Sequence, residues 1–302
     1  MAKFTLGINN CFAVKRWPEP DAWTKIVASD LELGVVQFSY DLLDPRTCAS
    51  ALMEVVEEIR DALKTYGVSI HSCFTGLAMY SFNLLMHPNQ AMRVDGIDWH
   101  EKGIMLASKL GAKGSGGHLA ALSCEDQKNE ERRKYLKNCL TDALSHLTGI
   151  AASLGHEFFL WEPMPISREP PCTISEAKRL LKEVNEVTKI PVKLCIDTGH
   201  QCPWDVTFPA DLDVYAWLRE LAQESPVIHI QQTDGKGDRH WPFTSEFNRD
   251  GIISSEKILK AIDDSGAKET LLALEIIHPF EARESQVLED LKLSVGYWKE
   301  YI

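Results

Sequence analysis

Four side chains that could bind a metal ion follow four successive apolar segments in the second half of the chain. They are Glu162, Asp197, His229 and Glu275. An unpaired carboxylate at the end of a buried segment is costly, so Asp197, which follows an apolar run, requires a cation, a hydrogen-bond donor or a metal nearby. Three carboxylates and one imidazole suit a divalent ion, whose charge offsets the repulsion between the acids. The sequence therefore predicts one divalent cation, Mn²⁺, Mg²⁺, Co²⁺ or Zn²⁺, with Mn²⁺ or Mg²⁺ favoured.

Five further residues are candidates for the same site. His200 closely follows the aspartate of the first set, and Asp238 and His240 lie in the loop after the seventh apolar segment. These three could orient the metal ligands, bind substrate hydroxyls or hold further metal. The alternative is a solvated loop whose charges pair with each other. His71 and His118 end two earlier apolar segments and are expected to face the same mouth, where a site role and a structural role are equally open.

Apolar strand-like runs alternate with longer amphipathic segments along the chain, which is the pattern of repeated βα units. Strands are expected at residues 4–9, 33–38, 68–71, 111–118, 158–161, 192–196, 227–230 and 271–276. Eight such units favour a single (β/α)₈ TIM barrel of the α/β class, in which side chains at the C-terminal ends of the strands form the active site. No linker or shift in composition divides the chain, so we expect one domain over residues 1–302.

The overall composition narrows the classes of partner. The 302 residues include 44 acidic and 32 basic side chains, which gives a formal net charge of −12. This balance lacks the basic footprint of nucleic-acid-binding proteins, so a nucleic-acid partner is disfavoured. No apolar run is long enough to cross a bilayer, no signal-peptide pattern precedes the first expected strand, and the eight cysteines are scattered. We therefore expect a cytoplasmic protein without a membrane partner, and a homo-oligomer stays open.

Two cationic residues, Lys15 and Arg16, lie in the loop expected after the first strand. They could hold a substrate phosphate or be solvated, and solvation is the favoured interpretation. No arrangement of serine, cysteine or lysine indicates a catalytic nucleophile.

At these residues the chain resembles the xylose-isomerase-like barrel superfamily, in particular its sugar-phosphate isomerases and epimerases. The resemblance rests on Trp-Glu-Pro at 161–163, Asp-Thr-Gly-His at 197–200, Ile-His-Ile at 228–230, Asp-Arg-His at 238–240 and Leu-Glu at 274–275. It implies that Glu162, Asp197, His229 and Glu275 ligate one divalent metal and that the two glutamates act on opposite sides of the substrate. The opening segment 9–17 is similar to the tetrulose-phosphate epimerases of erythritol breakdown.

The leading hypothesis is a metal-dependent epimerase or isomerase whose partner is a small ketose or ketose phosphate. The metal would polarise the carbonyl and stabilise the enediolate left after proton removal. Glu162 or Glu275 would take the proton next to the carbonyl, and the other would return one from the opposite face. His200 would steady the oxyanion by hydrogen bonding. Epimerisation and aldose–ketose isomerisation begin with the same proton transfer, so both stay open.

Two other functions compete with this hypothesis. Endonuclease IV shares the implied fold and also carries Asp-x-x-His and Asp-Arg-His motifs. Its three-zinc site needs nine ligands, which this chain could supply on paper from His71, His118, Glu162, Asp197, His200, His229, Asp238, His240 and Glu275. Against this multi-metal phosphodiesterase stand the acidic charge balance and the lack of an evident basic groove. The third candidate is a sugar-binding barrel without catalytic activity.

Overall fold

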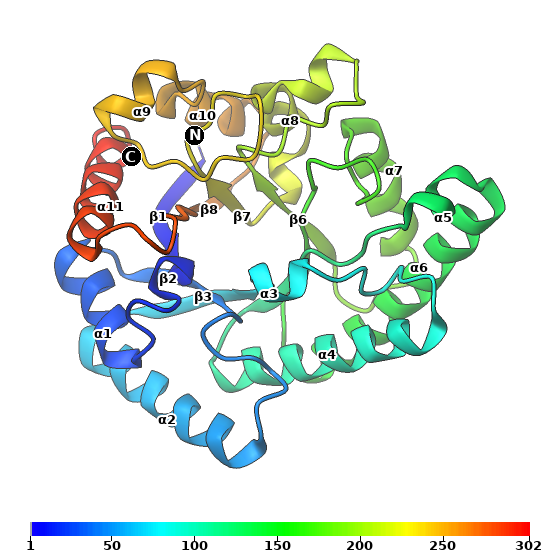
Figure 1. Cartoon of the computed structure of the whole chain (residues 1–302), viewed down its shortest axis with the longest axis horizontal. Coiled ribbons are helices and arrows are strands. Elements are labelled where there is room, and N and C mark those ends of the chain that lie inside the picture. Colours follow the sequence, from blue (N-terminus) through cyan, green and yellow to red (C-terminus); the bar gives the residue numbers. More distant parts are fainter. Residues whose placement is uncertain (1) are drawn as a thin grey trace.

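Eight parallel strands close into a barrel in the computed structural model, which describes residues 2–302. The strands are β1 (Lys3–Asn9), β2 (Val35–Ser39), β3 (Ser69–Phe74), β4 (Gly114–Gly117), β5 (Phe158–Trp161), β6 (Val192–Asp197), β7 (Val227–Ile230) and β8 (Glu269–Leu274). Each strand pairs with the next in sequence, and β8 pairs with β1 to close the ring, with Ile8 opposite Leu274. Figure 1 shows the helices arranged around these strands. The predicted (β/α)₈ fold is confirmed.

The longer helices lie on the outside of the barrel (Figure 1). The helices are α1 (Pro20–Lys25), α2 (Ala49–Tyr66), α3 (Leu77–Tyr80), α4 (Gln90–Lys109), α5 (Cys124–Lys128), α6 (Glu130–Ser153), α7 (Ile174–Asn185), α8 (Val214–Leu221), α9 (Ser245–Asp250), α10 (Ser255–Asp264) and α11 (Glu284–Lys299), with short turns η1 (Asn10–Ala13), η2 (Ile26–Asp30), η3 (Pro209–Leu212) and η4 (Ala222–Glu224). In α7, the Thr173 hydroxyl accepts from the Glu176 N–H and caps the helix. None of the helices in the described residues is both long and apolar enough to cross a membrane.

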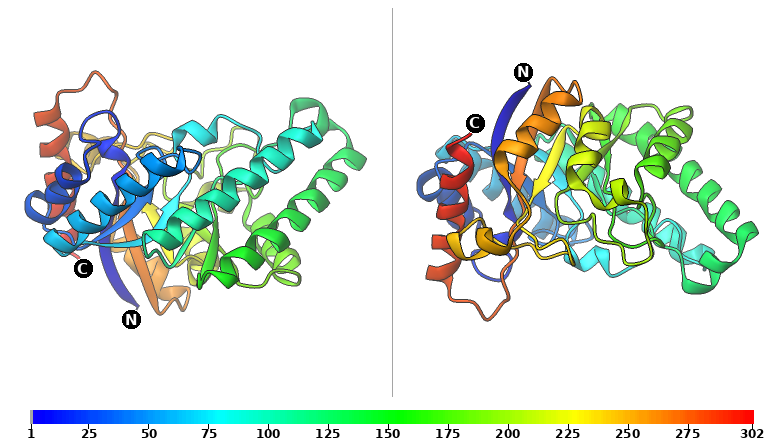
Figure 2. Two further views of the ribbon diagram at one scale, coloured as in Figure 1. Left: turned by 90° about the horizontal axis from the view of Figure 1, so that it is seen from below. Right: turned by 90° about the horizontal axis from the view of Figure 1, so that it is seen from above.

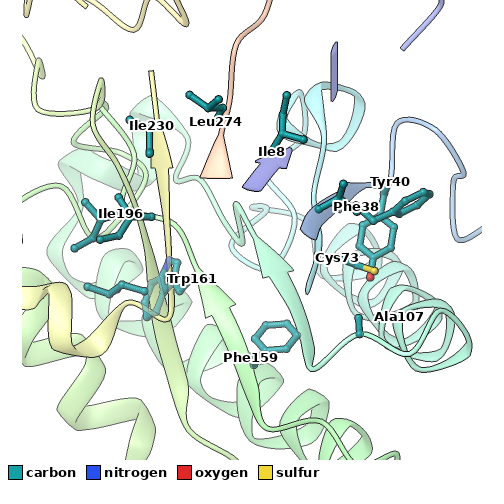
Figure 3. Close-up of a cluster of buried hydrophobic side chains, with 14 of the residues drawn as sticks. Ile8, Phe38, Tyr40, Cys73, Ala107, Phe159, Trp161, Ile196, Ile230 and Leu274 are labelled. Atoms are coloured by element: carbon teal, nitrogen blue, oxygen red, sulfur yellow. The ribbon is translucent and has the colours of Figure 1, made fainter. Parts of the chain in front are cut away.

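The strands bury side chains on both faces, and the two sets form separate apolar layers. The layer between strands and helices includes Ile8, Phe38, Trp161 and Leu274 (Figure 3). A smaller layer fills the barrel interior and consists of Phe74, Phe158, Leu160, Cys195, Val227, Leu271 and Ala273. Strands that are buried on both faces need near-continuous apolar runs, which is why most of them were recognisable in the sequence.

Strand β3 ends later than predicted, whereas β4 is shorter than its predicted range of 111–118 and β8 begins and ends earlier than its predicted range of 271–276. Strand β3 continues beyond His71 to Phe74. The added residues pair with β2, where Ser72 lies opposite Gln37 and Phe74 opposite Ser39. In the sequence, a polar residue such as Ser72 after an apolar run indicates the end of a strand. In the structure, Ser72 is part of the barrel wall.

Segments from the first and last parts of the chain lie side by side at the seam that closes the barrel. Views from below and above show α11 next to the segment that follows α1 (Figure 2), and Lys292 of α11 pairs with Asp30 at 2.9 Å. Arg16, in the loop after β1, donates hydrogen bonds to the carbonyls of Ala282 at 2.8 Å and Pro279 at 2.5 Å. Its side chain is only 5% exposed, so the interpretation of Arg16 as solvated is wrong. The loops after β1 and β8 are thereby tied together.

Candidate active site

Four ligand atoms converge at the C-terminal end of the barrel. Glu162 follows β5, Asp197 ends β6, His229 lies in β7 and Glu275 follows β8, and one atom from each lies within 4.8 Å of the others. The Nδ1 atom of His229 is 3.0 Å from Glu275 Oε2, 3.3 Å from Glu162 Oε1 and 3.9 Å from Asp197 Oδ2. All four residues are buried. The structure therefore brings together the four side chains that the sequence singled out first.

Two of the acids are held through one oxygen and direct the other toward the centre of this group. Asp197 Oδ1 accepts a hydrogen bond from Gln231 Nε2 at 2.9 Å, which leaves Oδ2 facing His229. Glu275 Oε1 accepts from Asn9 Nδ2 at 2.9 Å, which leaves Oε2 facing the same imidazole. The supporting bonds fix the direction of each carboxylate before any ligand is present.

The atoms that face the centre lack donors within the protein. Glu162 Oε1, Asp197 Oδ2 and His229 Nδ1 are buried without a hydrogen-bond partner. Among residues 2–302, no lysine or arginine forms an ion pair with any of the three acids, whose charged neighbours are histidines. Converging acceptors repel each other unless a cation lies between them. Three oxygens and one imidazole nitrogen in this arrangement fit a divalent metal ion.

The same geometry shifts the acid–base behaviour of the group. Burial raises the pKa of Asp197 to about 7. Burial also acts to raise the pKa of Glu275, but the adjacent His229 outweighs it and lowers that pKa to about 2. The pKa of His229 is raised well above its usual value, because Cys195 and Glu275 outweigh the opposing effect of burial. Without an ion the group balances its charge by holding protons, which a metal would displace.

A second group of ligand atoms, from His200, Asp238 and His240, lies beside the first. Asp238 Oδ2 is 3.4 Å from His200 Nε2 and 3.1 Å from His240 Nε2. Gln231 joins the two groups, because its Nε2 donates to Asp197 Oδ1 at 2.9 Å and to Asp238 Oδ1 at 2.6 Å. The loop residues therefore lie beside the first group.

The histidines of the second group are held in the charged form. Burial disfavours the charge on His240, but the hydrogen bond and charge of Asp238 outweigh it and raise the pKa of His240 to about 9. The pKa of His200 is raised well above its usual value, since Asp197 and Asp238 overcome burial in the same way. Conversely, His200 and His240 lower the pKa of Asp238 although burial opposes this. These rings are therefore potential proton donors to an anionic oxygen.

Both groups line one cavity at the barrel mouth, whose wall also includes His118 and Tyr80. The His118 ring packs edge-on against Tyr80 with centroids 5.1 Å apart. Its Nδ1 is 3.9 Å from Glu169 Oε2, and burial raises the pKa of Glu169 to about 7. No lysine or arginine is among the described residues that line the cavity, so its cationic groups are histidines.

His71 is not brought to this cavity. Its ring stacks on Phe158, the first residue of β5, with centroids 5.6 Å apart. Burial lowers the pKa of His71 to about 4. Because β3 runs on past it, Phe74 rather than His71 reaches the cavity wall. The expectation that His71 faces the mouth is therefore wrong, whereas His118 does lie there.

Three buried amide side chains contact the site although the sequence pattern did not single them out. Asn9 ends β1, Gln37 lies in β2 and Gln231 follows β7. Asn9 and Gln231 lie at or next to a strand end, which was the available signal, whereas Gln37 lies in the middle of β2. Neutral amide side chains are also common as ordinary buried hydrogen-bonding groups outside functional sites. The residue type alone therefore does not indicate a functional site.

Comparison with known proteins agrees with this fold. The family model described as xylose isomerase-like TIM barrel matches residues 27–295. A curated relative, the D-erythrulose 1-phosphate 3-epimerase of Brucella abortus (strain 2308), is 32% identical over 302 residues, which cover 99% of this chain and 96% of the relative. The crystal structure of a candidate xylose isomerase from Rhodospirillum rubrum ATCC 11170 superposes with a TM-score of 0.91 at 31% identity, over 98% of this chain and 99% of that one.

A more distant structure has the same fold. The D-psicose 3-epimerase of Clostridium cellulolyticum H10, solved with D-tagatose, gives a TM-score of 0.70 at 13% identity over 99% of each chain. At that identity the similarity concerns the fold alone. The erythrulose-phosphate relative confirms the predicted enzyme class, an isomerase. The family match and the full-length relative together show that the chain belongs to the xylose isomerase-like TIM-barrel family.

Proposed function

We propose that this chain is a divalent-metal-dependent epimerase of a small ketose phosphate of the tetrulose-phosphate class. The main support is the set of four buried ligand atoms, three of them without internal partners, in a chain 32% identical to a D-erythrulose 1-phosphate 3-epimerase. Glu162, Asp197, His229 and Glu275 hold the ion. A bound divalent ion polarises the substrate carbonyl and makes the neighbouring C–H bond more acidic.

Glu162 and Glu275 exchange the proton at the carbon next to the carbonyl. Glu162 follows β5 and Glu275 follows β8, and the strands of the two other ligands, β6 and β7, lie between these two strands in the barrel. The two carboxylates therefore approach a bound ketose from two sides. One carboxylate takes the proton from carbon 3, and the other returns a proton to the opposite face, which inverts that centre. His200 lines the same cavity and donates a hydrogen bond to the oxygen that gains negative charge. Asp238, His240 and His118 bind the hydroxyl groups of the sugar.

Proton exchange in D₂O tests this proposal. With Mn²⁺ and D-erythrulose 1-phosphate we expect deuterium at carbon 3, visible by NMR, and formation of the enantiomeric tetrulose phosphate, visible as a loss of optical rotation. Glu162→Gln and Glu275→Gln should each slow the exchange by about 100-fold or more. Parallel reactions with unphosphorylated erythrulose and with pentulose and hexulose phosphates define the substrate. The proposal fails if no ketose exchanges while Mn²⁺ is bound, and the residue assignment fails if both variants keep near-normal turnover.

The multi-metal phosphodiesterase has less support. Its nine-ligand site would need His71, which stacks on Phe158 away from the cavity, and His118, whose nearest acidic partner is Glu169 at 3.9 Å. The described residues contain ligand groups of four and three members, and neither group includes these two histidines. Metal analysis separates the alternatives, because about one ion per chain supports the epimerase and about three support the nuclease.

A further inference from the structure

We propose that Gln37, oriented by Asn9, is a positioning residue that fixes the tautomer of His229 and so supplies the metal centre with its nitrogen ligand. The proposal rests on the metal site proposed above. It concerns β1 and β2, two strands that carry none of the four ligands. A chain of hydrogen bonds runs from the backbone amide of Cys11 through Asn9 and Gln37 to the imidazole of His229.

The first link is the orientation of Asn9. The Cys11 N–H donates to Asn9 Oδ1 at 3.0 Å. A backbone N–H can only donate, so the side-chain atom opposite it must be the oxygen and the other must be the nitrogen. That nitrogen lies 3.0 Å from Gln37 Oε1 and 2.9 Å from Glu275 Oε1. Asn9 is therefore a donor to both of these side chains.

The second link is the orientation of Gln37. Because Asn9 donates to it, the Gln37 atom at this contact must be the acceptor oxygen. The same oxygen lies 2.5 Å from His229 Nε2, while Gln37 Nε2 donates to Ser72 Oγ at 3.2 Å. An amide oxygen cannot donate, so His229 Nε2 must carry a hydrogen. Asn9, Gln37 and His229 are each at most 1% exposed, so water does not compete for the bonds between them.

The third link is the atom that His229 leaves for the ion. A neutral imidazole with its hydrogen on Nε2 has its lone pair on Nδ1. Nδ1 is the atom that lies 3.0 Å from Glu275 Oε2 and 3.3 Å from Glu162 Oε1. The opposite tautomer would direct an N–H into the centre and leave only the carboxylates to bind a cation. Gln37 thus selects the ring form that binds metal while lying outside the ligand group.

A purely structural role for Gln37 predicts lost stability but no change in the protonation pattern of His229. We therefore test the tautomer directly, by ¹⁵N NMR of histidine-labelled, unaltered protein saturated with Mg²⁺. The expected spectrum has a proton bonded to His229 Nε2 and none on Nδ1. A proton on Nδ1 would overturn the proposal, and this measurement does not depend on the folding of any variant.

Mn²⁺ affinity, measured by calorimetry on the full chain, supplies the second test. Gln37→Met removes the acceptor at similar size, and we expect affinity to fall by about 10- to 100-fold. Gln37→Glu keeps an acceptor toward Nε2 and should bind Mn²⁺ at least as tightly as the unaltered protein. Equal affinity of a folded Gln37→Met variant would overturn the proposal.

Gln232→Met is the matched control. Gln232 is 1% exposed, like Gln37 at 0%, but its amide bonds Asn248 Oδ1 at 2.9 Å and the Ile253 carbonyl at 3.1 Å, away from the ligand group. We expect this variant to lose stability while its Mn²⁺ affinity stays unchanged. If the unaltered protein bound neither Mn²⁺ nor Mg²⁺, the proposed metal site and this inference would fail together. If it binds Mn²⁺ and Gln37→Met binds equally well, only this inference fails.

Discussion

Gln231 donates a hydrogen bond from Nε2 to Asp197 Oδ1 at 2.9 Å, and neither side chain is exposed. Its Oε1 accepts from the backbone N–H groups of Arg239, at 3.1 Å, and His240. One amide thus connects a proposed metal ligand to the loop that carries the second ligand group. The position of that loop depends on this side chain.

Replacing Gln231 by leucine should therefore uncouple the loop from the barrel. The substitution removes an acceptor from two backbone N–H groups and a donor from Asp197 and Asp238, so we expect the free energy of unfolding to fall by about 2 kcal/mol or more. The KM for the ketose should rise, because Asp238 and His240 lose their support. Urea unfolding and steady-state kinetics measure the two effects. Gln232→Leu is the control, with reduced stability and little change in KM; an unchanged KM for Gln231→Leu would contradict the prediction.

Gly199 is packed against the same glutamine. A Cβ at this position would lie 2.4 Å from Gln231 Cδ. We expect Gly199→Ala to cost about 1–3 kcal/mol, because overpacking displaces Gln231 from Asp197. Gly296→Ala is a control of opposite sign. Apart from the neighbouring residues and the backbone of its own helix, no atom lies within 4 Å of a Cβ there, and Gly296 is exposed in α11, so we expect a gain of about 0.5–1 kcal/mol. Chemical unfolding of both variants checks the prediction, which fails if Gly199→Ala is as stable as the unaltered protein.

Metal removal should lower thermal stability, because the converging acids then repel each other. Ligand binding to the folded state alone stabilises by about 2.7 kcal/mol when the free Mn²⁺ concentration is 100 times the Kd. We expect the Tm to rise on Mn²⁺ addition after chelator treatment, and Asp197→Asn to abolish most of that rise. Differential scanning calorimetry gives the Tm, and elemental analysis gives the number of ions. A Tm insensitive to both chelator and Mn²⁺ would contradict a metal centre.

The stability of the metal-free protein should fall as pH rises from about 6.5 to about 9. The pKa of His240 is raised from 6.5 to about 9 in the folded state, since Asp238 outweighs burial. A histidine whose pKa is raised in the folded state stabilises the fold. The full contribution is present at pH values below the pKa of the unfolded chain, and it is lost as pH rises through the pKa of the folded state. It amounts to about 3 kcal/mol at most. Urea unfolding across this range measures the slope.

His240→Asn is a suitable variant for this measurement. His240 has a φ of 50°, a left-handed conformation that asparagine tolerates better than most residues. We expect a shallower slope between pH 6.5 and 9, with His200 responsible for part of what remains. An identical slope in the variant would show that the ring of His240 is not the titrating group.

The strands and the first ligand group were predictable because both follow from local rules. Strands buried on two faces give apolar runs, and the runs around Phe158 and Val227 coincide with β5 and β7 as observed. Side chains at the C-terminal ends of such strands meet at the mouth of a barrel. Glu162 and Asp197 could therefore be grouped without knowing any tertiary contact.

The supporting residues could not be identified in this way, because their roles depend on neighbours from other strands. Gln37 is a neutral residue inside an apolar run, and its importance comes from facing Asn9 and His229, which are distant in the sequence. His71 was misplaced for a related reason, since only the pairing of Ser72 with β2 shows that β3 continues past it. Charge and periodicity reveal the ligands, whereas the amides that orient them emerge only from the folded neighbourhood.

The hydrogen bond between Asn9 and Glu275 spans 266 residues across the seam that closes the barrel. During translation, Asn9 leaves the ribosome 266 residues before Glu275, which follows only after β8 has been made. A nascent chain that ends after β7 contains Asp197 and His229 but has neither the last carboxylate nor a closed ring. The four side chains of the proposed metal site are therefore present together only once β8 and Glu275 have been made.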